Sequence, residues 1–100
     1  MRGWGLGTRQ IVELGQFLKN ARLKAGLSQF DVAQRLKLKT SQFVSNWERG
    51  LCPPSSDSLP IIAKVFQLSE REFLAYLHRL REEALLDHYR DCKKSYRRPG

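Results

Sequence analysis

The sequence predicts an all-α protein of five helices, in which the last helix runs well past the length that the core requires. Apolar residues recur at spacings of three and four, which is the period of an amphipathic helix. Polar capping residues and glycines separate these segments, and no segment shows the alternation of a half-buried strand. With 100 residues, 41% of them hydrophobic, the chain is expected to form one domain around a single modest core.

The first helix is expected from about Arg9 to Ala25. Its apolar residues fall on one face and include Leu14, Leu18 and Ala21. Gly26 follows and ends the helix, because glycine adopts the left-handed conformation without strain. Residues 1–8 hold three glycines and little periodicity, so we expect a flexible N-terminal arm there.

Two short helices joined by a tight turn are predicted next. Ser28 is a capping residue for the first of them, which runs to about Leu36. The turn occupies residues 37–39. Thr40 is expected to cap the second helix, which stops at Gly50.

The second of these short helices is expected to bury one face and expose the other. Val44 and Trp47 face the core. The outward face carries polar residues, namely Ser41, Gln42, Ser45, Asn46 and Arg49. A helix with short polar side chains at its exposed N-terminus suits insertion into the major groove of DNA.

Gln42 and Asn46 are the leading candidates for reading bases. An amide side chain can bond bidentately to N6 and N7 of adenine, and the i, i+4 spacing puts both amides on one helix face. Ser45 lies between them in the sequence, and its small side chain permits close approach. Phe43 falls beside this face and could contact a sugar, a thymine methyl group or only the preceding short helix. Of these we favour packing.

A fourth helix is predicted from about Ser56 to Phe66, after a loop that two prolines stiffen. Pro60 falls in its first turn, where a proline is tolerated. Residues 69–72, Ser-Glu-Arg-Glu, match a capping box and begin the fifth helix.

The fifth helix is expected to continue to about Cys92, with residues 93–100 disordered. Its core-facing seam at three- and four-residue spacing comprises Phe73, Leu77, Leu80 and Ala84. A second, rotated stripe comprises Leu85, Leu86, Tyr89 and Cys92. Because no core remains for this stripe to cover, we expect a second copy of the chain to cover it. The alternative is that the stripe folds back onto the first helix.

Positive charge is unevenly distributed along the chain. The formal net charge is +8 and the pI is 10.0. Residues 16–50 hold seven basic and two acidic residues, residues 51–92 hold five basic and seven acidic ones, and residues 93–100 hold four basic ones. This pattern favours a polyanionic partner, either nucleic acid or an acidic membrane surface. No run approaches the roughly 20 apolar residues of a membrane span, and the start of the chain has no apolar signal region.

The cysteines and histidines give no clear sign of a covalent or metal site. Cys52 and Cys92 stand far apart and form no CxxC pair, so we expect neither a disulfide nor a zinc site. Free cysteines are typical of a reducing compartment, so we expect the protein in the cytoplasm. His88 and Cys92 stand four apart on one helix, but two further metal ligands are not evident. No nucleophile with a base, no paired carboxylates and no phosphate loop are evident, so we expect no enzyme and no cofactor.

Taken together, these features resemble the XRE family, the phage repressor and Cro-like helix-turn-helix proteins, over roughly residues 13–77. The features at family spacing are Arg22, Gly26, Leu27, Ser28, Gln29, Ala33, Val44, Glu48, Arg49, Gly50, Pro54, Leu59, Ile62, Ala63, Leu68, Ser69 and Phe73. Two features depart from the usual pattern of the family. The turn between the short helices is one residue longer than usual, and Lys37 stands where glycine is common. The resemblance implies a repressor-like helix-turn-helix domain over residues 9–80, followed by a helical extension and basic tail over residues 81–100.

The resemblance also implies roles for particular residues. Family members read bases from the positions that match Ser41, Gln42 and Asn46. Arg22 and Glu48 match residues that form an ion pair, which orients the recognition helix. From their charge or position, the candidates for phosphate contacts are Gln29, Lys37, Lys39, Thr40 and Arg49.

The resulting prediction is a sequence-specific, repressor-type transcription regulator that binds double-stranded DNA. A dimer of this kind would bind a palindromic operator, with half-sites about one helical turn apart. One alternative is an antitoxin or another protein-interaction module that uses the same fold. A second is an adaptor whose helix-turn-helix meets protein or RNA.

Overall fold

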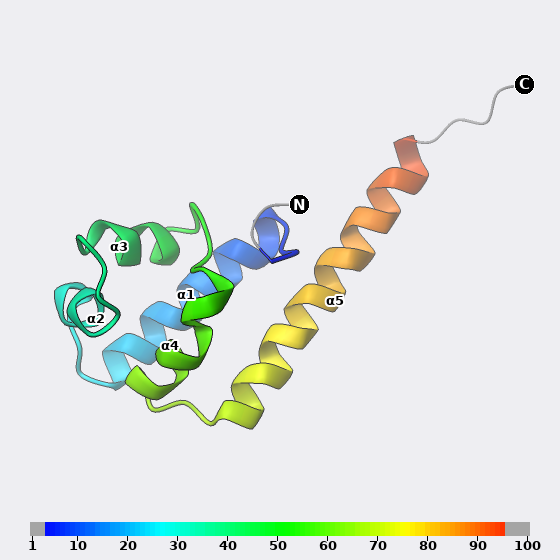
Figure 1. Ribbon diagram of the computed structural model, residues 1–100. Helices are drawn as coiled ribbons and strands as arrows, with labels where there is room; N and C mark the ends of the chain where they lie inside the picture. The colour runs from blue at the N-terminus through cyan, green and yellow to red at the C-terminus, as the bar shows by residue number, and fades with distance from the viewer. Residues whose placement is uncertain (1–3, 96–100) are drawn as a thin grey trace, which may run out of the picture.

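Five α-helices and one short 3-10 helix form the regular structure of residues 4–95, which the computed structural model describes (Figure 1). In chain order they are α1 (Thr8–Lys24), α2 (Gln29–Arg35), α3 (Gln42–Glu48), η1 (Ser56–Ser58), α4 (Leu59–Val65) and α5 (Glu70–Ser95). The predicted all-α class and the five predicted helices are therefore confirmed. Within residues 4–95 there is no strand.

α1 lies at the centre of the molecule, with α3 against one part of it and α5 against another. Figure 1 shows α2 and α3 together at one end, and α5 running along the opposite side until it projects away from the body. The most completely buried large side chains include Leu14 and Leu18 of α1, Val32 of α2, Val44 of α3 and Ile62 of α4. One continuous core thus holds all the helices together.

The helix ends follow the local chemistry predicted from the sequence, with one correction. The Ser28 hydroxyl accepts from the N–H of Asp31, and the Asp31 carboxylate accepts from the N–H of Ser28, each at 2.9 Å. The cap of α3 was expected at Thr40, but Ser41 holds that position and its side chain makes no capping bond. The Thr40 hydroxyl instead accepts from the N–H of Gln42 at 3.1 Å, so it stabilises the helix start from one residue earlier.

The N-terminal segment is not the flexible arm that was expected. Leu6 is completely buried, and the indole N–H of Trp4 donates to the carbonyl of Pro54 at 2.9 Å. The expectation is therefore wrong for residues 4–8, while residues 1–3 lie outside the described part of the chain. The reason is that a tryptophan and a leucine in a glycine-rich segment gain more from burial than the segment loses in conformational entropy.

The C-terminal helix is also longer than expected. α5 continues through residues 93–95, which were expected to be disordered, and residues 96–100 lie outside the described part. Its 26 residues span about 39 Å. The predicted seam is confirmed, because Phe73, Leu77, Leu80 and Ala84 are all buried.

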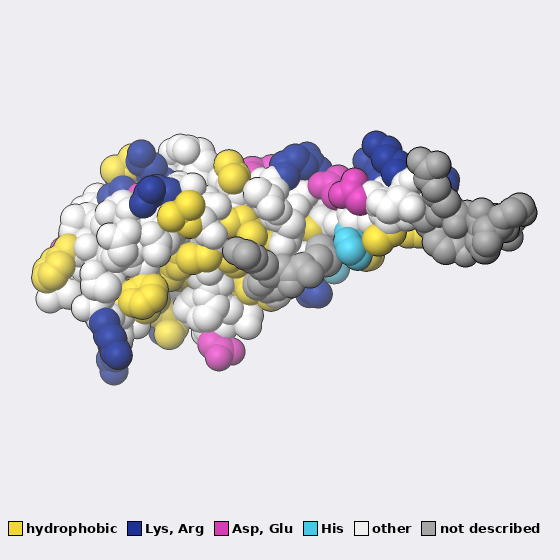
Figure 2. Space-filling view, turned by 90° about the horizontal axis from the view of Figure 1, so that it is seen from above, with side chains coloured by type: hydrophobic (Ala, Val, Ile, Leu, Met, Phe, Trp, Pro, Cys, Tyr) yellow, Lys and Arg dark blue, Asp and Glu magenta, His cyan; other side chains and the backbone are white. Residues whose placement is uncertain are grey.

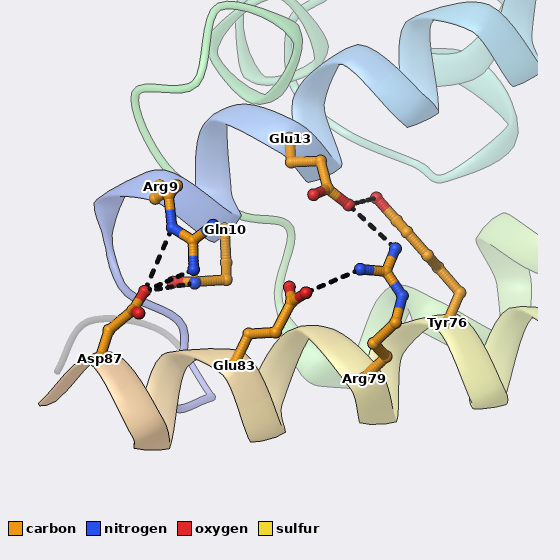
Figure 3. Close-up of polar contacts among 7 residues, drawn as sticks. All are labelled: Arg9, Gln10, Glu13, Tyr76, Arg79, Glu83 and Asp87. Atoms are coloured by element: carbon orange, nitrogen blue, oxygen red, sulfur yellow. Dashed lines mark hydrogen bonds and ion pairs between the residues drawn. The ribbon is translucent and has the colours of Figure 1, made fainter. Parts of the chain in front are cut away.

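Polar contacts with α1 hold α5 beyond this seam (Figure 3). The Asp87 carboxylate accepts from the amide of Gln10 at 2.9 Å and from the guanidinium of Arg9 at 2.9 and 3.2 Å. The hydrogen bond from Gln10, followed by that from Arg9, lowers the pKa of Asp87 below its usual value. The compact part of the molecule therefore extends beyond the range 9–80 that was expected.

A second group of contacts lies nearer the start of α5 (Figure 3). The Tyr76 hydroxyl donates to Glu13 at 2.8 Å, and its ring stacks on Phe17 with centroids 4.3 Å apart. Burial, and then the bond to Glu13, raises the pKa of Tyr76 above its usual value. Arg79 bridges Glu13 and Glu83 at 3.3 and 2.9 Å. These contacts fix the direction in which α5 leaves the body.

Gly15, in the middle of α1, allows the end of α3 to approach very closely. A Cβ atom at this position would lie 2.1 Å from the carbonyl oxygen of Trp47. Glycine in a helix interior is normally unfavourable relative to alanine. Here it is required, because any side chain would separate α1 from α3.

Candidate nucleic-acid interface

A buried ion pair holds the inner side of α3. The guanidinium of Arg22 donates to Glu48 through Nε at 2.6 Å and through Nη2 at 3.0 Å. The two side chains are only 9% and 4% exposed. Nη1 of Arg22 also donates to the carbonyl of Leu27 at 2.9 Å, and the amide of Gln29 donates to Glu48 at 3.0 Å. This pair was implied by the family resemblance, and the structure contains it.

The contacts around Glu48 join α1, the start of α2 and the end of α3. Within residues 4–95, no buried side-chain nitrogen or oxygen lacks a hydrogen-bond partner. A bidentate, fully bonded arginine–carboxylate pair restricts rotation as well as separation. The geometry therefore fixes the orientation of α3 against the rest of the domain.

The side chains on the outer side of α3 are polar and accessible. Gln42 and Arg49 are exposed, and Ser41, Ser45 and Asn46 are half-buried. The amide of Gln42 donates to Oδ1 of Asn46 at 2.9 Å. This bond leaves Oε1 of Gln42 as an acceptor and Nδ2 of Asn46 as a donor. Adenine presents the complementary pair in the major groove, the N6 donor and the N7 acceptor.

The candidates for phosphate contacts flank this face. Lys37, Lys39, Thr40 and Arg49 are exposed, the first three of them before the start of α3 and Arg49 at its end. Gln29 is half-buried and its amide already bonds Glu48, so its side chain has a structural role. A phosphate contact by any of these residues remains a prediction.

Lys37 has a φ of +57°, in the left-handed region. This is the position where the family commonly has glycine, so the structure explains that preference. A non-glycine residue there stores about 1–2 kcal/mol of backbone strain. The turn nevertheless forms, because the N–H groups of Lys37 and Leu38 bond to the carbonyls of Gln34 and Ala33 at 3.1 and 2.9 Å.

Both acidic groups in residues 16–50 are engaged within the protein. Glu48 pairs with Arg22, and Asp31 is held by Ser28, which lowers the pKa of Asp31. Basic side chains thus outnumber exposed carboxylates on this part of the surface, where Asp31 interacts with Arg35. Figure 2 shows Lys and Arg side chains on the compact end of the molecule and on the projecting end of α5.

Two further expectations concern individual residues. Packing was favoured for Phe43, but the side chain is 44% exposed on α3, so it is not a core residue. Its neighbour Val44, which is 1% exposed, takes the core position. Trp47, in contrast, is buried as predicted.

The structure contains no cluster of three or more metal-ligating side chains in the part that it describes. Cys52 is half-buried and Cys92 is exposed, and neither forms a disulfide. No helix among residues 4–95 is both long and apolar enough to span a membrane.

Sequence reasoning did not identify Gly15 or the structural use of Gln29. An isolated glycine within a helical pattern is the one signal that pointed to a close approach at position 15. The partner of Gln29 could not be read from the pattern, because Glu48 comes from another helix.

Two short helices joined by a turn, with the second held rigidly by its buried side and polar on its exposed side, define a helix-turn-helix DNA-binding protein of the repressor type. The family model described as helix-turn-helix matches residues 18–73. The chain belongs to this family, as the resemblance to XRE proteins implied.

Solved structures of one protein, the restriction-modification controller protein C.Esp1396I, are similar to this chain. The wild-type protein shares 25% sequence identity with a TM-score of 0.57, over 77% of this chain and 95% of that chain. A point mutant of it shares 25% identity with a TM-score of 0.58, over 79% and 92%. Its tetramer in complex with its natural 35-base-pair operator shares 26% identity with a TM-score of 0.56, over 76% and 95%. No curated protein sequence matches the chain.

Proposed function

We propose that this protein is an operator-binding transcription regulator in which α3 enters the major groove. Ser41, Gln42, Ser45 and Asn46 read the bases, and Lys37, Lys39, Thr40 and Arg49 contact phosphates. The observation that carries this proposal is the exposed Gln42–Asn46 amide pair, on a helix whose opposite side is locked by Arg22 and Glu48. Fold and family are those of DNA-binding regulators, so we propose binding rather than catalysis, without a cofactor. Such a regulator acts in the cytoplasm, where its operator lies.

We further propose that the protein binds as a dimer through the stripe Leu85, Leu86 and Tyr89. These side chains are 61%, 47% and 65% exposed on the projecting part of α5. The stripe does not fold back onto α1, because Ala84 and Asp87 face α1 instead. The operator-bound tetramer of C.Esp1396I supports assembly on DNA. A dimer would cover the stripe and present two recognition helices to a palindrome.

The decisive experiment is the selection of bound sites from a randomised DNA pool at near-physiological salt. Enrichment of a palindrome would support sequence-specific binding by a dimer, and its half-site spacing would give the distance between the two α3 helices. If only salt-sensitive, sequence-independent binding is found, the proposal fails. The antitoxin-like or other protein-interaction function would then be favoured.

Replacing Asn46 by alanine is expected to weaken binding to the selected site by about 1–3 kcal/mol and to relax preference at one base position. The change removes the Nδ2 donor and also releases Gln42 from its hydrogen bond. Equilibrium binding to the site and its single-base variants, all at one salt concentration, measures both effects. Asn20→Ala, an exposed amide in α1, is the matched control and should leave binding unchanged. An unaltered ranking of the base variants would rule out Asn46 as a base reader.

Replacing Leu85 and Leu86 together by aspartate is expected to give a folded monomer. Both side chains are exposed in one chain, so the change disturbs no core packing but places charge in the proposed interface. Sedimentation gives the oligomeric state, and circular dichroism confirms that the helices persist. Leu23→Asp, at a similarly exposed position of α1, is the control and should remain a dimer. A double variant that still sediments as a dimer would contradict the proposed interface.

A further inference from the structure

Phe43 is a large apolar side chain on the otherwise polar outer side of α3. It is 44% exposed, whereas the other aromatic residue of this helix, Trp47, is 5% exposed. Single exposed apolar residues are common on protein surfaces. This one, however, lies in the first turn of the helix that is proposed to enter the major groove.

Helical geometry places Phe43 at one edge of the proposed reading face. Successive residues are separated by roughly 100° around the helix, so Phe43 lies beside Asn46, three residues on. Ser45 lies on the opposite edge, with Gln42 and Asn46 between. The phenyl ring is therefore next to the amide pair and can reach a base that neighbours the one those amides contact.

The chemistry of the groove offers one clear partner for such a ring. The edges of the bases present hydrogen-bond donors and acceptors, together with a single apolar group, the C5-methyl group of thymine. The amide groups of Gln42 and Asn46 form hydrogen bonds and do not select for a methyl group. An exposed phenyl ring beside them can favour a methyl group, because contact removes apolar surface of both the ring and the methyl group from water.

We propose that Phe43 contacts the C5-methyl group of a thymine in each half-site and thereby determines specificity for that base. This inference rests on the proposed function, since it requires α3 to lie in the major groove. It adds that the half-site contains a thymine next to the base read by the amide pair.

The test replaces each thymine of the selected site by deoxyuridine, which lacks only the methyl group. One position is changed at a time, in both half-sites, and binding is measured for the wild-type protein and for Phe43→Ala. For the wild-type protein we expect deoxyuridine at one position to weaken binding about fourfold per half-site, the effect of burying one methyl group. Phe43→Ala should bind the thymine and deoxyuridine sites equally at that position.

Two controls distinguish this contact from a general loss of structure. Circular dichroism and thermal unfolding of Phe43→Ala establish that it is folded, as its exposure leads us to expect. Leu23→Ala removes a similarly exposed apolar side chain from α1 and should keep the full discrimination between thymine and deoxyuridine. Phe43→Leu keeps an apolar side chain and should therefore keep part of the discrimination between thymine and deoxyuridine.

The possible failures are distinct. If the wild-type protein selects a site but Phe43→Ala shows the same thymine-to-deoxyuridine ratio at every position, the methyl contact is refuted while the proposed function stands. If Phe43→Ala instead loses the same affinity for the thymine and deoxyuridine sites, the methyl contact is also refuted, and contact with a sugar is indicated. If the wild-type protein selects no site, both proposals fall.

Discussion

Replacing Arg22 by alanine is expected to lower the free energy of unfolding by about 3–5 kcal/mol. The change would leave the carboxylate of Glu48, whose side chain is 4% exposed, with only the amide of Gln29 as a partner. It would also free the carbonyl of Leu27, which Arg22 bonds at 2.9 Å. Chemical denaturation followed by circular dichroism measures the loss. Because the pair orients α3, binding to the selected site should weaken as well, even where the variant is still folded.

Arg9→Ala is the matched control for this prediction, since both arginines lie in α1 and pair with a carboxylate. The Arg9–Asp87 pair has a similar distance of 2.9 Å, but its side chains are 68% and 35% exposed. Solvent screens such a pair, so its loss should lower the free energy of unfolding far less than Arg22→Ala does. If both substitutions lowered the free energy of unfolding equally, the buried Arg22–Glu48 pair would stabilise the fold no more than the exposed Arg9–Asp87 pair does.

Replacing Gly15 by alanine is expected to destabilise the protein by about 3 kcal/mol, although alanine is the better helix former. The added methyl group would lie 2.1 Å from the backbone oxygen of Trp47, and a backbone atom cannot move aside as a flexible side chain can. α1 and α3 must therefore separate, which disturbs the core and tilts the recognition helix. We expect a lower unfolding temperature together with weaker operator binding.

Lys19→Ala, one turn further along α1, is the control for Gly15→Ala. Lys19 is exposed, so the substitution tests helix propensity in the same element without a packing conflict. The free energy of unfolding of the Lys19→Ala variant should therefore differ little from that of the wild type. If Gly15→Ala were as stable as the wild type, or more stable, the close approach of α1 and α3 would not constrain the fold.

The features predicted correctly depend on residues close together in the chain. Ser28 caps α2 through Asp31, three residues on. Gly26 and Gly50 end their helices with φ values of +73° and +74°. Such contacts are local, so a single sequence contains both partners within one turn. The burial of Val44 and Trp47 followed from helical period alone.

Two expectations that did not hold concern residues whose surroundings come from distant parts of the chain. Residues 4–8 were expected to be a flexible arm, but the indole N–H of Trp4 donates to the carbonyl of Pro54, which lies fifty positions away in the sequence. Packing was favoured for Phe43, yet its side chain is 44% exposed. In both cases the outcome depends on which element lies opposite, and the local pattern does not contain that information.

The sequence by itself determined the all-α class, the helix boundaries to within a few residues, the helix-turn-helix resemblance and the polar outer side of α3. These properties follow from periodicity and capping, which act between near neighbours. The Arg22–Glu48 pair was implied by the resemblance. Only the tertiary structure decided the close contact of α3 at Gly15, the bond from Gln29 to Glu48, and which apolar side chains remain exposed. Close packing between helices requires atoms to fit within fractions of an ångström, and that fit exists only once the helices are in place.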